Sequence, residues 1–342
     1  MQIYLNSFGT YLHVKEAMFE IRVPAEGGVV TKHHLSAKKV TAIILTVAGA
    51  LSSDAIRLAL MHNVDLILAD RSGQPLGRFW HAKLGSTSKI RKRQLGASLD
   101  ARGLKYTGDW LAAKLEAQAV MLQRLKKHRK HHHELLDERR ERIGDLAAAI
   151  GTCVAKASLV SEVADTLRGL EGTAGRLYWQ TLSALTPEPY RFAGRSFRPA
   201  GDAFNAFINY GYGVLYGRVE KALMTAGLDP YVGFMHRDDY NQKSMVFDFI
   251  EPYRPLVYHV VFRLFSGKKV NTTHYGELAG GITLEKPGKE MLIEALGEYL
   301  DGEKVRHHRR VRSRMNGMLA DAHRFAQELL EVEITDLEIT EL

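Results

Sequence analysis

Two carboxylates stand three positions apart in a segment that is otherwise apolar. They are Asp248 and Glu251, and the residues around them are Met245, Val246, Phe247, Phe249 and Ile250. On a helix this spacing would place both carboxylates on one face. Burying an unpaired charge is very costly, so such acids need a metal ion, a base or another cation. The pattern alone leaves two readings open, a catalytic acidic pair and a structural salt bridge to Arg254.

Glu171 is a second candidate for chemistry. It precedes the small residues Gly172, Ala174 and Gly175, which would allow another helix or a ligand to approach closely. Two histidine-rich stretches attract attention for metal binding, but three consecutive histidines on a helix point in three directions and cannot share one ion. We therefore interpret 126–133 as solvated or DNA-facing surface. His307-His308, beside two arginines, has the same interpretation, with phosphate contact as the alternative.

The elements that must position these residues fall into two kinds. Up to about residue 80, short β-branched and aromatic runs separated by Gly, Asn and Pro predict strands, with one short helix after Ser52-Ser53. The later chain has helical apolar spacing. We predict an α+β protein with a β-rich dimerisation domain at 1–80, a basic linker at 81–95 and an all-α-helical catalytic domain at 96–342. Strands followed by a run of helices argue against a doubly wound sheet.

Charge points to a polyanionic partner. The 342 residues carry a net charge of +8, and residues 71–142 hold 18 Lys/Arg against 7 Asp/Glu. Nucleic acid is the default partner for such a basic stretch, and a solvated surface is the alternative. The single cysteine, Cys153, excludes an internal disulfide and a Cys-rich zinc site, and the longest nearly apolar run, 40–51, is too short to span a membrane. We expect a cytoplasmic protein without a signal peptide.

Several sequence blocks in a fixed order resemble the CRISPR adaptation integrases, the Cas1 family. The blocks run from Arg168 to Pro255: Arg-Gly-Leu-Glu-Gly, Tyr-Trp, Gly-Arg-Ser-Phe-Arg-Pro, Asp202 with Asn205-Ala206, Asn-Tyr-Gly-Tyr, Gly-Leu-Asp-Pro, Gly-Phe-Met-His and Asp-Phe-Ile-Glu-Pro-Tyr-Arg-Pro. Such a series is more specific than any one motif. The β-rich start and helical remainder also resemble that family's two-domain plan.

The resemblance implies a divalent metal held by Glu171, His236 and Glu251. Asp248 would then be an adjacent catalytic residue that binds through water or orients the site. The chemistry agrees, because carboxylates with one imidazole suit Mg²⁺ or Mn²⁺, whereas Zn²⁺ more often takes sulfur or several histidines. A further set of residues is expected to contact DNA: Arg195, Arg198, Asn205, Tyr210, Tyr212 and Arg254.

The function implied is a metal-dependent DNA endonuclease and integrase that joins foreign fragments to CRISPR array DNA through their 3′-hydroxyl ends. The resemblance also implies a homodimer, double-stranded DNA as substrate and a small ferredoxin-like Cas partner protein. Two alternatives remain at this point. One is a non-catalytic DNA-binding subunit, against which Glu171, His236 and Glu251 argue, since a binding module needs no metal ligands. The other is a metal nuclease that acts on branched DNA or RNA in repair.

Overall fold

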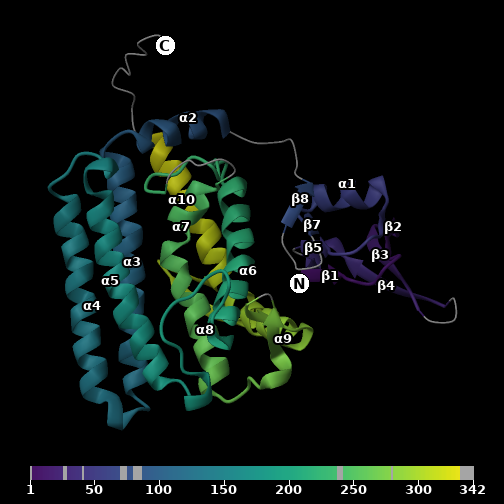
Figure 1. Ribbon diagram of the computed structural model, residues 1–342. Helices are drawn as coiled ribbons and strands as arrows, with labels where there is room; N and C mark the ends of the chain where they lie inside the picture. The colour runs from purple at the N-terminus through teal and green to yellow at the C-terminus, as the bar shows by residue number, and fades with distance from the viewer. Residues whose placement is uncertain are drawn as a thin grey trace. The chain divides into compact units, whose positions relative to one another are not determined.

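The computed structural model describes residues 2–25, 29–40, 42–69, 75–79, 87–236, 242–278 and 280–331. The chain separates into two compact units, Met1–Gly85 and Ser86–Leu342 (Figure 1). The first unit is rich in strands and the second is mostly helical, which confirms the predicted α+β class. Across the described ranges, no helix is long and apolar enough to cross a membrane.

The first unit contains two four-stranded sheets. Their strands are β1 (Gln2–Leu5), β2 (Tyr11–Lys15), β3 (Met18–Pro24), β4 (Val30–Ser36), β5 (Ala42–Leu45), β6 (Ala50–Leu51), β7 (Asp65–Ala69) and β8 (Pro75–Phe79). One sheet has the order β1-β5-β7-β8, in which the first three strands are parallel and β8 is antiparallel to β7. The other has the order β4-β3-β2-β6, with β6 parallel to β2.

A short helix completes this unit. Helix α1 (Ser53–Met61) begins where Ser52 accepts a hydrogen bond from the Ala55 amide, so the predicted capping serine does cap it. Leu12, Phe19 and Ile43 are fully buried, and they form the core with apolar residues of α1. The unit therefore has its own interior despite strands of seven residues or fewer.

A buried carboxylate on β3 gathers three basic groups. Glu20 has a side-chain exposure of 1% and accepts hydrogen bonds from Arg22 Nε at 2.7 Å, His13 Nε2 at 2.8 Å and His34 Nε2 at 2.7 Å. The Arg22 hydrogen bond and, to a smaller degree, the two imidazoles outweigh desolvation. Together they lower the pKa of Glu20 from 4.5 to about 2.

This cluster predicts an acid-dependent stability. A carboxylate with a depressed pKa stabilises the fold above its unfolded-state pKa of 4.5, and that contribution disappears as the pH falls towards 2. Urea unfolding of wild type and Glu20→Gln should therefore show a stability difference at pH 7 that shrinks by pH 3. Glu116→Gln, an exposed change in the second unit, is the control. A difference that is equal at both pH values would contradict this account.

The second unit is built mainly from helices. They are α2 (Thr87–Ser98), α3 (Ala101–Lys126), α4 (His133–Val154), α5 (Val160–Leu185), α6 (Ala203–Thr225), α7 (Ser244–Phe249), α8 (Arg254–Ser266), α9 (Lys286–Gly297) and α10 (Arg314–Glu331). Helices α3, α4 and α5 run side by side over most of their lengths (Figure 1). Their apolar stripes join a single large core that also includes α6, α8 and α10.

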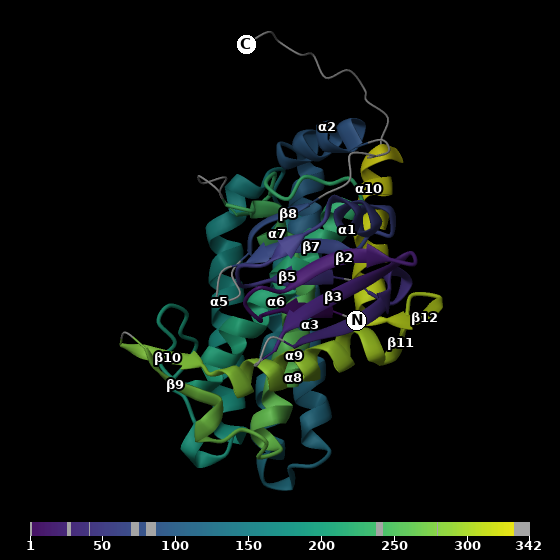
Figure 2. The same cartoon turned by 90° about the vertical axis from the view of Figure 1, so that its right-hand side faces the viewer.

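Two features of this unit differ from the sequence prediction. Residues 87–95, expected in the linker, belong to α2, while residues 81–86 lie outside the described part of the chain. The unit is also not entirely helical, because it carries the hairpins β9 (Tyr275–Leu278) with β10 (Gly281–Leu284) and β11 (Lys304–His307) with β12 (Arg310–Ser313). Figure 2 shows the hairpins at opposite sides of the unit. Strands of four residues, rich in charge or glycine, give too weak an alternation to be recognised.

Candidate active site

A buried lysine on α3 is the centre of the site. The inward face of α3 includes Leu104, Leu111, Leu115 and Leu122, and Lys114 lies on the same stripe. Its Nζ donates to Glu251 Oε2 at 2.6 Å and makes a second, shorter contact with Glu171 Oε1. Burial disfavours the ammonium, but the charges of Glu251 and Glu171 outweigh burial and raise the pKa of Lys114. Lys114 is therefore a cation at neutral pH.

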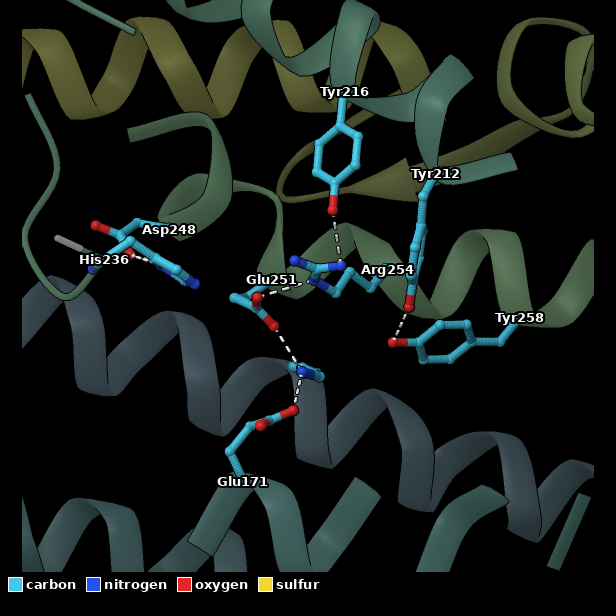
Figure 3. Close-up of polar contacts among 9 residues, drawn as sticks. Glu171, Tyr212, Tyr216, His236, Asp248, Glu251, Arg254 and Tyr258 are labelled. Carbon is cyan, nitrogen blue, oxygen red and sulfur yellow. Dashed lines mark hydrogen bonds and ion pairs between the residues drawn. The ribbon is translucent and has the colours of Figure 1, made fainter. Parts of the chain in front are cut away.

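Glu171 and Glu251 approach this ammonium from separate parts of the chain. Glu171 comes from the middle of α5, and Glu251 begins the 3-10 turn Glu251–Tyr253 that leads into α8. Figure 3 shows the two carboxylates pointing toward each other. Glu251 is buried, with a side-chain exposure of 7%, whereas that of Glu171 is 32%. The two acids thus share a cation but differ in their access to solvent.

Glu251 has a second cationic partner. Arg254 Nε donates to Glu251 Oε1 at 2.8 Å, and Arg254 Nη1 lies 3.3 Å from the Tyr216 hydroxyl (Figure 3). Burial would raise the pKa of Glu251, but the charges of Arg254 and Lys114 outweigh it and lower that pKa to about 2. The salt bridge to Arg254, one of the two readings left open by the sequence, is present.

Asp248 holds His236 in place. Its Oδ1 accepts from His236 Nδ1 at 2.5 Å and from the His236 amide at 3.2 Å (Figure 3). Its Oδ2 accepts from the amides of Phe234 and Met235 at 2.5 and 3.0 Å. A carboxylate on Nδ1 fixes the ring and its tautomer, which leaves Nε2 as the nitrogen available to a ligand. Asp248 is therefore a positioning residue.

Gly233 allows the loop to lie against α7. A Cβ at this position would lie 2.5 Å from Ser244 Cβ and 3.0 Å from Asp248 Oδ2. A Cβ contact of 2.5 Å essentially never occurs with a real side chain, so any other residue would push the loop away from α7. The Gly-Phe-Met-His tetrapeptide thus has glycine where the backbone must pass close to the carboxylate.

The predicted shared helical face of Asp248 and Glu251 is wrong. Helix α7 ends at Phe249, and Glu251 lies in the following 3-10 turn, which Pro252 helps to start. The two carboxylates consequently take different partners, His236 for Asp248 and Lys114 with Arg254 for Glu251.

One cavity collects the three predicted metal ligands. It has a volume of about 590 Å³ and is lined by acidic, basic and aromatic side chains: Leu111, Lys114, Arg168, Glu171, Trp179, Arg195, Phe197, Tyr212, Tyr216, Met235, His236, Gln242, Phe247, Glu251, Arg254 and Tyr258. Glu171, His236 and Glu251 are all in this lining. The structure therefore brings together residues that are up to 80 positions apart in the sequence.

The donor chemistry of this cavity fits a divalent cation. Lys114 Nζ already stands between the carboxylates of Glu171 and Glu251, so the gap between them accommodates a positive charge. Carboxylate oxygens with one imidazole nitrogen are a donor set for Mg²⁺ or Mn²⁺. The described residues bring three ligand atoms within 4.8 Å of one another at His307, His308 and Asp321, and not at the predicted set. Lys114 occupies the intervening space instead.

The predicted DNA-contacting residues have unequal positions. Arg195 and Arg254 line the cavity, with their guanidinium carbons 5.4 and 4.8 Å from the Tyr212 ring centroid. Tyr212 also lines it, but its hydroxyl is committed to Tyr258 at 2.6 Å (Figure 3). All three residues therefore belong to the cavity wall, although Tyr212 is only 4% exposed.

The remaining three predicted contacts are outside the cavity lining. Asn205 is 1% exposed, and its amide bonds to Gly194 O and Asp202, so it has a structural place rather than the predicted DNA contact. Tyr210 is half-buried on α6, and Arg198 lies over the ring of Phe197 at 5.2 Å. A polar motif in sequence does not reveal which of its side chains are buried.

Comparison with known proteins identifies the family. The family model described as CRISPR associated protein Cas1 matches residues 3–298. A CRISPR-associated endonuclease Cas1 from Archaeoglobus fulgidus is 33% identical over 315 residues, which cover 89% of this chain and 89% of that protein. The chain belongs to the Cas1 family.

Solved structures share the fold of this Cas1 family chain. A casposase bound to integration product has a TM-score of 0.76 at 22% identity, covering 100% of this chain and 94% of that one. A chain of a Cas6-RT-Cas1–Cas2 complex has a TM-score of 0.71 at 19% identity, covering 96% of this chain and 35% of that one. At these identities the likeness establishes the fold alone.

Sequence reasoning missed Lys114 and Arg168. Lys114 could have been found as a charged residue on an apolar helical stripe, between Leu111 and Leu115. Arg168 belongs to the Arg-Gly-Leu-Glu-Gly block, and its Nη2 lies 3.4 Å from Met235 O, next to His236. Its side chain is 44% exposed, whereas Arg195 and Arg254 in the same cavity wall are half-buried.

Replacing Asp248 tests the positioning of His236 in this Cas1 family chain. Asn has one acceptor oxygen, which cannot serve three backbone amides and the ring N–H, so Asp248→Asn should release His236. We expect Mn²⁺ affinity or activity to fall about 10- to 100-fold. Calorimetric Mn²⁺ titration checks the affinity, and Asp109→Asn, an exposed carboxylate on α3, is the control. Unchanged Mn²⁺ binding and activity in Asp248→Asn would refute the positioning role.

Proposed function

We propose that this chain is a metal-dependent DNA endonuclease and integrase of CRISPR adaptation. In the joining reaction, a DNA 3′-hydroxyl attacks a phosphodiester of the array, and the 3′-oxygen of the broken strand leaves. One observation carries the proposal: Glu171, His236 and Glu251 line a single cavity whose wall also holds four basic residues, Lys114, Arg168, Arg195 and Arg254. Membership in a family with relatives named endonucleases supports the same activity.

The chain's own residues have separable tasks in this proposal. Glu171, Glu251 and His236 Nε2 would hold the cation, which when bound polarises a phosphodiester oxygen and offsets the charge that develops on it. Asp248 orients the imidazole through Nδ1. Arg168 pairs with Asp165 at 2.6 Å through Nη1, and its half-exposed guanidinium would meet phosphate oxygens from this position. Arg195 instead is held by Asn205 and Asn209 and contributes mainly positive charge to the wall.

A matched pair of DNA ends tests the reaction. Purified protein, with its proposed partner, receives a supercoiled array plasmid and labelled fragments that end in a 3′-hydroxyl or a 3′-deoxy group. We expect label to join the plasmid only from the 3′-hydroxyl fragment and only with Mg²⁺ or Mn²⁺. Water-dependent nicking should survive with the 3′-deoxy fragment. Joining in excess EDTA would overturn the metal requirement, and joining of the 3′-deoxy fragment would overturn the proposed nucleophile.

DNA binding should be separable from chemistry. Distributed Lys and Arg contacts to phosphate supply most affinity for nucleic acid. EDTA should therefore abolish joining while fragment binding, measured by fluorescence anisotropy, falls by less than about threefold. Loss of binding in parallel with joining would show that the cation mainly holds DNA.

We also propose a homodimer that forms through the first unit, working with the small ferredoxin-like partner. Strand β8 is an edge of its sheet and carries Leu76 at 74% exposure, with Phe79 at 36%. Exposed apolar edge strands generally need cover. Light scattering should find a dimer for the full chain and a monomer for Leu76→Lys. A dimer of unchanged strength in Leu76→Lys would move the interface elsewhere.

A further inference from the structure

Two histidines and an aspartate converge at the β11–β12 hairpin, apart from the cavity. His307 Nε2 and His308 Nε2 lie 2.9 and 3.1 Å from Asp321 Oδ1, and all three ligand atoms are within 4.8 Å of one another. The histidines belong to the hairpin, and Asp321 belongs to α10. The cluster thus ties two elements of the second unit together.

The hairpin turn explains why neighbouring histidines can face one point. Consecutive residues of a strand point to opposite sides. His308 follows β11 and has φ = +51°, a left-handed conformation that reverses the chain. As a result the two rings lie 4.3 Å apart, centroid to centroid, at 73°. The sequence placed His307 and His308 at the surface, and both side chains are partly exposed, but it did not predict the turn that makes them converge.

Residues around the cluster shape it further. A Cβ at Gly317 of α10 would lie 3.1 Å from His307 Cγ, so glycine lets that ring pack against the helix backbone. The Tyr253 hydroxyl donates to Asp321 Oδ2 at 2.9 Å, which leaves Oδ1 directed at the two histidines. Such a hydrogen bond to the second oxygen is the usual outer support of a ligating carboxylate.

We propose that His307, His308 and Asp321 form a second metal site, for a borderline divalent transition ion, Zn²⁺. Two imidazole nitrogens with one carboxylate oxygen suit Zn²⁺, and they differ from the carboxylate-rich set of the cavity. The site is partly exposed, with side-chain exposures of 26%, 48% and 23%, so water can complete the coordination. Its place in the fold indicates a structural clip between hairpin and helix.

Zn²⁺ binding at this cluster requires the imidazole protons of His307 and His308 to move. In the hydrogen-bonded cluster each Nε2 carries the proton that Asp321 accepts, and Arg324 Nη1 lies 3.5 Å from His308 Nδ1. Zn²⁺ binding at Nε2 moves each proton to Nδ1. The 3.5 Å contact between Arg324 and His308 is then given up, and Arg324 Nη2 also lies 4.0 Å from Asp321 Oδ1.

Zinc titration of the metal-stripped full chain tests the site. We expect one Zn²⁺ per chain bound at the hairpin and at least about 100-fold weaker binding in His308→Gln, because even outer partners of a metal ligand are worth about 10- to 100-fold. His323→Gln, an exposed histidine on the same helix, is the matched control and should bind as wild type. Asp321→Asn is the second loss variant.

A cavity variant separates the two sites. His236→Gln should keep the hairpin zinc, and zinc should raise the melting temperature of both wild type and His236→Gln but not that of His308→Gln. Since His308 is half-exposed, His308→Gln should melt as wild type without zinc. Zinc affinity unchanged in both His308→Gln and Asp321→Asn, or lost in His236→Gln, would overturn the proposal.

Discussion

Glu251→Gln is expected to abolish catalysis and also to destabilise the protein, whereas Glu171→Gln should abolish catalysis alone. Glu251 is buried between Lys114 and Arg254, so its neutralisation leaves two buried cations with one fewer counter-charge. Removing one member of a buried ion pair costs about 3–5 kcal/mol. The same chemical change at Glu171, which is one-third exposed, should cost about 1 kcal/mol or less.

Both variants should lose at least about 100-fold in joining rate, because a bound metal supplies several kcal/mol of charge stabilisation and each 1.36 kcal/mol is tenfold. Urea unfolding and the fragment-joining assay measure the two effects separately. Glu116→Gln controls for loss of a surface carboxylate. Equal destabilisation by both variants would contradict the burial argument, and wild-type joining by either would show that the site is misassigned.

Lys114→Met is expected to raise Mn²⁺ affinity and to lower the stability of the metal-free protein. The ammonium occupies the gap between Glu171 and Glu251, so it competes with any cation that those carboxylates bind. Without the ammonium, the carboxylates of Glu171 and Glu251 face each other, and only Glu251 keeps a cationic partner, Arg254. We expect at least about tenfold tighter Mn²⁺ binding, equivalent to about 1.4 kcal/mol.

Titration calorimetry measures that affinity, and thermal unfolding with and without Mn²⁺ gives a second readout. The metal-free variant should melt at a lower temperature than metal-free wild type. Mn²⁺ should raise the melting temperature of the variant by more than that of wild type. Lys105→Met is the matched control, because Lys105 is on the same helix but pairs with Asp109 at the surface. Weaker Mn²⁺ binding in Lys114→Met would mean that Lys114 holds the ligands in place rather than competing for them.

The order of the sequence blocks predicted the cavity but not its central cation. Glu171, His236 and Glu251 were found because each falls in a recognisable block. Lys114 lies 57 residues before Glu171 and 137 before Glu251, and only the packing of α3 against α5 and the Glu251–Tyr253 turn shows the contact. A single charged residue on an apolar stripe indicates that its side chain is buried, but the sequence does not show which carboxylates pair with it.

Local conformation accounts for the errors. The spacing of Asp248 and Glu251 assumed one continuous helix, but Pro252 accompanies a change to a 3-10 turn that separates their partners. Asn205 was expected to contact DNA because it lies in one of the blocks that resemble the family, whereas burial commits its amide to Gly194 and Asp202. Residue type and spacing predict which chemistry is available, and exposure and backbone direction decide where it is used.

The close approach of Gly233 to α7 also limits where this chain can be joined to a related protein in a chimaera. Asp248 accepts hydrogen bonds from the backbone amides of the loop that contains Gly233 and His236, so these three residues depend on one another. Glu251 follows directly after the end of α7. Consider a chimaera with a related protein whose crossover point lies between residues 233 and 251. Its loop would come from one parent and the carboxylate that binds the loop from the other. Exchange of the segment as a whole keeps these contacts within one parent, so it is the natural unit for transplanting this part of the site.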